Sequence, residues 1–153
     1  VLSGVDNERG WEAVVDLTIS RLGMDAASDA MKHLDSAKVR LAIMQADDSA
    51  RNAVDPSERE TSTRAAAAIR AALQQRLGEP VVLEKLALIV IALQCGYVQA
   101  CEPESVTEQL EQALRDASTA CPEQLARVAL SKDVSKEDME TLRKSLERSF
   151  TTA

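Results

Sequence analysis

The segment from Val81 to Ala100, VVLEKLALIVIALQCGYVQA, limits the fold most, because apolar residues cover every side of a helical wheel drawn through it. A helix that is apolar on all sides is stable only when other structure surrounds it. Its longest uninterrupted apolar run, Leu86–Leu93, is much shorter than the roughly 20 residues needed to cross a bilayer. We therefore predict a buried central helix over about residues 81–101.

The composition predicts that helices surround this segment. The chain has 153 residues, 45% of them apolar but only 2% aromatic, so its core must be built mainly from aliphatic side chains and alanine. Strands favour aromatic and β-branched residues and contain little alanine. We expect a single all-α domain over residues 1–153, an irregular bundle of six to seven helices. Because the chain begins with Val1, we expect a processed protein or a segment of a longer one.

Helix limits can be placed from apolar spacing and from capping residues. We expect helices over residues 6–22, 25–46, 56–77, 81–101, 105–117, 122–130 and 135–150, with a polar linker beginning at Asp47. Asp55, Ser105 and Ser135 are each followed three residues later by an acid, the pattern of a capping box. Gly96 inside the central helix suggests either close packing of a neighbouring helix, which we favour, or a local bend.

The segment 25–46 carries the most regular apolar pattern in the chain. Its apolar positions alternate at spacings of three and four, as in a heptad seam, and half of them are small. The members of this predicted seam are Ala27, Ala30, Leu34, Ala37, Leu41 and Met44. Small side chains allow a second helix to approach closely. We expect the seam to pack within the domain, and contact with another subunit is the alternative.

The three cysteines indicate a reduced thiol state. Cys95 and Cys101 are six residues apart on one predicted helix, about 9 Å along its axis, which is farther than a disulfide can span. Cys121 follows another predicted helix and should lie farther away. We therefore expect a cytoplasmic or other reducing intracellular compartment. Cys95 is expected to be a buried packing residue, and Cys101 is less enclosed because it ends the helix.

No pattern in the sequence predicts catalysis, a metal site or a cofactor. His33 is the only histidine, whereas a metal site usually needs several ligands at helical spacing. Nucleophile turns, phosphate-binding glycine loops and calcium loops do not occur. Most carboxylates occupy helix starts or exposed faces, and Glu84 is the one expected near the core. Arg59 three residues before Ser62 matches a short kinase signal that is common by chance.

The net charge of −7 bears on possible partners. Nucleic acids and anionic membranes both require basic surfaces, so neither is expected as a partner. We predict a non-enzymatic protein-interaction or regulatory module such as an adaptor, inhibitor or assembly subunit. A protein partner with a basic surface is expected, and a homo-oligomer is an open alternative. The alternative function is a small-molecule or lipid-responsive domain with a pocket at Gly96 and Tyr97.

Overall fold

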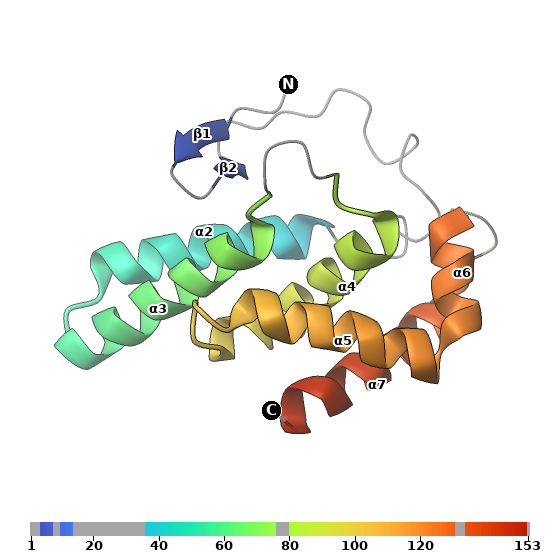
Figure 1. Cartoon of the computed structure of the whole chain (residues 1–153). Coiled ribbons are helices and arrows are strands. Elements are labelled where there is room, and N and C mark those ends of the chain that lie inside the picture. The colour runs from blue at the N-terminus through green and yellow to red at the C-terminus, as the bar shows by residue number, and fades with distance from the viewer. Residues whose placement is uncertain (1–3, 8–9, 14–35, 76–79, 131–133, 153) are drawn as a thin grey trace.

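The structure is a computed structural model, and it describes residues 4–7, 10–13, 36–75, 80–130 and 134–152 (Figure 1). The described residues are predominantly helical, which confirms the all-α class. Their elements are the strands β1 (Gly4–Asn7) and β2 (Gly10–Ala13), the helices α2 (Ser36–Asn52), α3 (Pro56–Leu73), α4 (Leu83–Gln94), α5 (Val106–Ala120), α6 (Pro122–Leu130) and α7 (Lys136–Thr152), and the 3₁₀ turn η2 (Val98–Ala100).

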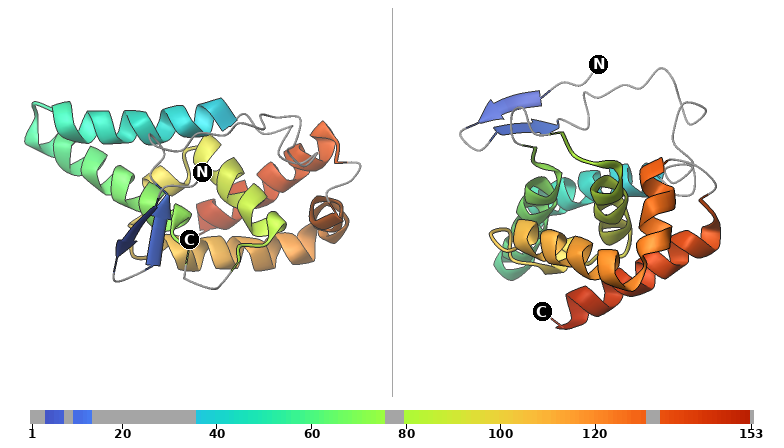
Figure 2. Two further views of the ribbon diagram at one scale, coloured as in Figure 1. Left: turned by 90° about the horizontal axis from the view of Figure 1, so that it is seen from above. Right: turned by 45° about the vertical axis from the view of Figure 1, so that its right-hand side comes forward.

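Helix α4 contributes to both parts of the hydrophobic core. The consecutive residues 87–93 are all buried. One side of α4 contributes to a cluster with α5, α6 and α7, and the other side contributes to a cluster with α3, η2 and α5. Figures 1 and 2 show these helices arranged around α4. None of the described helices combines the length and apolarity needed to cross a membrane.

The first described residues form two antiparallel strands where we expected a helix. Strands β1 and β2 pair antiparallel, with Asn7 opposite Gly10 and Asp6 opposite Trp11. The predicted helix over residues 6–22 is therefore wrong up to residue 13, and residues 14–22 lie outside the described part. Gly10 contributes to the error, because glycine weakens a helix interior, and here it is the first residue of β2, paired with Asn7.

Helix α4 is shorter than the predicted 81–101 because Gly96 ends it. Gly96 has a φ of +79°, a conformation that is favourable for glycine and rare for other residues. The Gly96 N–H donates to Leu93 O at 3.3 Å and the Tyr97 N–H donates to Ala92 O at 3.0 Å, the two hydrogen bonds of a Schellman motif. A Cβ atom at Gly96 would meet nothing within 4 Å. The expected close helix packing is therefore wrong, and the glycine serves to terminate the helix.

This geometry gives a prediction for Gly96. Gly96→Ala should lower the free energy of unfolding by about 1–2 kcal/mol, because alanine must adopt the same left-handed conformation. Gly96→Asn should lose less, since asparagine tolerates that conformation better. Urea unfolding midpoints of the two variants provide the measurement. Equal stability of wild type and Gly96→Ala would contradict a role for the positive φ.

The three predicted capping boxes have different outcomes. At α7 the Ser135 N–H donates to Asp138 Oδ2 at 2.9 Å, and the Asp138 N–H donates to Ser135 Oγ at 3.1 Å, so the box is confirmed. At α3 the Asp55 carboxylate accepts from the Ser57 N–H at 3.0 Å, an N-cap without the reciprocal bond. Ser105 makes no side-chain cap to α5. Its hydroxyl donates instead to Glu102 O at 3.0 Å.

Candidate interaction surface

Helix α2 lies at one edge of the bundle, with one side against the core. The view from above in Figure 2 shows α2 along the outside of the helical assembly, next to α3. Ile43 and Ala46 pack against the core cluster that includes α3 and α4. Leu41 and Met44 belong to the opposite side and are 53% and 44% exposed. The described part of α2 is therefore amphipathic, with two large apolar side chains on its outer face.

For Leu41 and Met44, these exposures correct the expectation that the predicted seam packs within the domain, and for its other four residues the expectation stays a prediction. Leu41 and Met44, the two seam residues whose side chains are described, face outward. Ala37 belongs to α2, although its side chain lies outside the described part, as do Ala27, Ala30 and Leu34. The inward positions are Ile43 and Ala46. A heptad count alone could not decide between the two sides, because apolar residues occur on both.

Helix α2 also extends farther than expected. Residues 47–52, which were expected to begin a linker, form its last turns. Asp47 pairs with Arg70 of α3 at 2.5 Å between Oδ1 and Nη2. Arg59 of α3 donates from Nη2 to Ala53 O at 2.8 Å, just after α2 ends. These contacts fix the polar turns against α3, so polarity here marks a helix–helix junction.

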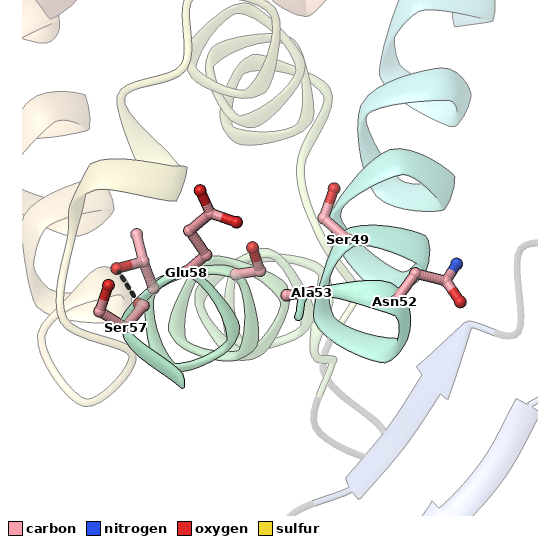
Figure 3. Close-up of a pocket in the computed structure, with 7 residues that line it drawn as sticks. Ser49, Asn52, Ala53, Ser57 and Glu58 are labelled. Carbon is pink, nitrogen blue, oxygen red and sulfur yellow. Dashed lines mark hydrogen bonds between the residues drawn. The ribbon is translucent and has the colours of Figure 1, made fainter. Parts of the chain in front are cut away.

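A pocket of about 490 Å³ lies at this junction (Figure 3). Its lining consists of Ser49, Asn52, Ala53, Ser57, Glu58, Thr61 and Ser62. The Thr61 hydroxyl donates to Ser57 O at 3.0 Å, so that hydroxyl already has a partner within the helix. The lining contains no described histidine, lysine or cysteine that could activate one of the serine hydroxyls. The pocket is open, and its mostly polar residues offer hydrogen-bonding groups without a nucleophile–base pair.

A second pocket of about 550 Å³ lies between α3 and the turn before α5. Arg64 of α3 pairs with Glu102 of that turn, with 3.0 Å between Nη1 and Oε1. Both side chains are well exposed, so this ion pair contributes little to stability. Arg59 and Glu60 also line this pocket. Its charges are mixed, which gives no strong preference for a cation or an anion.

The predicted pocket beside Gly96 and Tyr97 stays a prediction, and one of its two residues makes an aromatic contact. The Tyr97 ring stacks on Phe150 of α7, with 5.5 Å between centroids and 19° between planes. Neither Gly96 nor Tyr97 lines the two pockets described above. The aromatic contact joins the end of α4 to α7. This contact fills the Tyr97 side of the predicted pocket position, whereas the space beside Gly96 is open.

The three cysteines are free thiols in surroundings that favour the protonated form. Burial raises the pKa of the Cys95, Cys101 and Cys121 thiols above the ordinary value. For Cys95, the nearby Arg143 acts in the opposite direction but more weakly. Cys101 and Cys121 are buried and Cys95 is only partly buried, which reverses the expected order. Because the thiolate is the reactive form, raised pKa values favour unreactive, protonated thiols at neutral pH.

The remaining chemical candidates are not brought together into a site. His33 lies outside the described part of the chain. Among the described residues, no three histidine, cysteine, aspartate or glutamate side chains gather closely enough to hold a metal ion. Arg59 is exposed and Ser62 is partly buried, and both belong to the continuous helix α3. In the described part of the chain, these candidates do not form a reaction centre, and the exposed apolar side chains of α2 are the feature that bears on function.

Comparisons with models of known protein families and with curated protein sequences found no match to this chain. The functional assignment therefore depends on the surfaces that the structure describes. The sequence placed Leu41 and Met44 in a candidate interface but assigned the face mainly to internal packing. Lys38 and Asp48, which stand on either side of that apolar pair in the sequence, were not among the predicted interface residues. The sequence shows their spacing from the apolar pair, but only the structure shows which side of α2 is exposed.

Proposed function

We propose that this chain is a non-enzymatic protein-interaction module and that the outer face of α2 provides its docking surface. One observation carries the proposal: Leu41 and Met44, one turn apart, are both about half exposed on a helix whose other side is packed. Neighbouring apolar side chains of this kind can anchor a partner once they are fully desolvated. Methionine adapts easily to the shape of a partner surface.

The charge of the whole chain and the charge of this face have different implications. A net charge of −7 steers a basic partner toward the chain over long distances, and a basic partner remains a prediction on that ground. The face itself is mixed, because Asp48 and Arg51 are both exposed near the C-terminal end of α2. Tyr97 is stacked on Phe150 at one side of the pocket position expected for the small-molecule alternative, which favours the interaction surface over that alternative.

The proposal predicts that the Leu41→Glu/Met44→Glu double variant loses its partner. Burying either carboxylate in an interface would be unfavourable, so we expect association to weaken by at least about 30-fold, the loss expected for one strong interface residue. Tagged wild type and the variant should be compared in extracts of the native source by size-exclusion chromatography. Wild type should elute in a larger species and the variant as a monomer.

Leu130→Glu provides the matched control, because Leu130 is 71% exposed at the end of α6 and is not part of α2. This control should elute like wild type. Thermal unfolding of all three proteins should agree closely, since the changed side chains are exposed. If the double variant remains in the same larger species as wild type, the outer face of α2 is not the docking surface.

A further inference from the structure

The charges around the exposed apolar pair follow an arrangement that a second copy of the chain could match. Lys38 stands three residues before Leu41, and Asp48 stands four residues after Met44. Residues three or four apart lie on the same side of a helix. The outer face of α2 therefore has two apolar side chains in its middle and an exposed acid near its end. Lys38, whose side chain lies outside the described part, occupies the helix position one turn before Leu41.

Reversing the direction of a second α2 helix brings opposite charges together. A twofold axis that runs perpendicular to α2 and passes between the two copies at the level of residue 43 relates position 38 of one copy to position 48 of the other. The two Lys38–Asp48 pairings then flank the Leu41 and Met44 side chains contributed by both copies. A parallel arrangement would place Lys38 beside Lys38 and Asp48 beside Asp48. The sequence of this face is thus self-complementary in the antiparallel direction, as a twofold interface requires.

We propose that the partner of the α2 face is a second copy of this chain, bound antiparallel through α2. This inference rests on the proposed function, because it names the occupant of the same docking surface. The chain-wide charge of −7 opposes self-association, but that repulsion is screened beyond about 8 Å at physiological salt. Contacts between the two helices act at shorter range and are locally attractive.

The size of the face indicates a weak and reversible dimer. Helix α2 has 17 residues and is therefore about 25 Å long. A single helix face of that length covers less than the roughly 800 Å² per partner that is usual for stable complexes. Dimer formation should consequently depend on protein concentration. It should be measured up to the highest concentration at which the protein does not aggregate.

Sedimentation equilibrium of the purified full chain tests this inference. Wild type should shift from monomer toward dimer as its concentration rises. Lys38→Glu places two acids opposite each other at both ends of the interface, and Asp48→Lys places two bases there. Each single variant should dimerise at least about fivefold more weakly, given the usual strength of exposed ion pairs. Circular dichroism of each variant checks that the helices are retained.

Mixing the two single variants provides the decisive measurement. In the mixture, Glu at position 38 of one chain faces Lys at position 48 of the other, and the native Asp48 and Lys38 face each other at the opposite end. A heterodimer at least as tight as the wild-type dimer supports the antiparallel arrangement. Failure of the mixture to associate better than either variant alone would overturn it.

A strictly monomeric wild type would also overturn the inference while leaving the proposed function intact. The two failures are distinguishable through Leu41→Glu/Met44→Glu in the native extract. If that double variant no longer elutes in the larger species in the native extract, the α2 face binds a different protein. If neither the purified chain nor the extract shows any dependence on this face, both the dimer and the proposed function are wrong.

Discussion

Leu88→Ala should lower the free energy of unfolding by about 3–4 kcal/mol. Leu88 is 1% exposed in the middle of α4, within the cluster formed with α5, α6 and α7. Truncation removes buried apolar atoms and leaves a cavity that neighbouring helices can close only in part. The loss is a large share of the 5–15 kcal/mol that usually stabilises a domain.

The same substitution at an exposed leucine isolates the effect of burial. Leu130→Ala deletes the same atoms from a side chain that is 71% exposed, so its effect should remain within about 0.5 kcal/mol. Urea unfolding followed by far-ultraviolet circular dichroism measures both variants under the same conditions. A loss below about 1 kcal/mol for Leu88→Ala would show that the interior around α4 is not closely packed.

Asp138→Ala should cost about 2–3 kcal/mol at neutral pH. Asp138 is 4% exposed, and its carboxylate accepts hydrogen bonds from the Ser135 N–H and hydroxyl, each at 2.9 Å. Arg127 of α6 donates from Nη1 to Oδ1 at 2.9 Å. Hydrogen bonds to charged groups are stronger than neutral ones. The substitution removes the capping box of α7 and its link to α6 together.

Glu137→Ala is the matched control for Asp138→Ala. Glu137 lies in the same first turn of α7 and is exposed, so both variants lose one favourable charge near the helix start. That contribution is about 0.3–1 kcal/mol. The difference between the two variants therefore measures the capping box and the contact with Arg127. Equal losses would show that Asp138 acts through its charge alone.

The contribution of Asp138 should disappear in acid. The hydrogen bond from the Ser135 N–H is the main cause that lowers the pKa of Asp138, and burial opposes it without reversing the direction. A lowered folded-state pKa means that the carboxylate stabilises the fold fully above its unfolded value of about 3.9. The stabilisation is lost as the pH falls below that value and through the folded-state pKa. The gap between wild type and Asp138→Ala should narrow over that range.

Local signals in the sequence predicted several elements because short-range chemistry determines them. Pro122 was expected to open a helix and is the first residue of α6. Ser135 and Asp138 form reciprocal hydrogen bonds across a single turn, so their pairing depends little on the rest of the chain. The apolar face of α5 also follows from its spacing, and Val106, Leu110 and Ala113 are buried.

The errors occur where distant parts of the chain decide the outcome. Ser105 has the same apparent capping pattern as Ser135, yet its hydroxyl bonds to Glu102. Asp47 was assigned to a linker, but its contact with Arg70, 23 residues away, belongs to a helix junction. Which face of α2 is buried could not be predicted from the sequence for the same reason. Ile43 and Leu41 are both large and apolar, and only the packing of α3 and α4 determines which one remains exposed.

The position of the β1–β2 sheet has a practical consequence for spectroscopy. The chain has one tryptophan and one tyrosine. Trp11 belongs to β2, whereas Tyr97 stacks on Phe150 between the end of α4 and α7. Tryptophan emission will therefore report on the β1–β2 sheet, while the near-ultraviolet signal of Tyr97 will report on the helical bundle. Coincident transitions from the two chromophores would mean that sheet and bundle unfold as one cooperative unit, and separate midpoints would identify the sheet as an independently melting part.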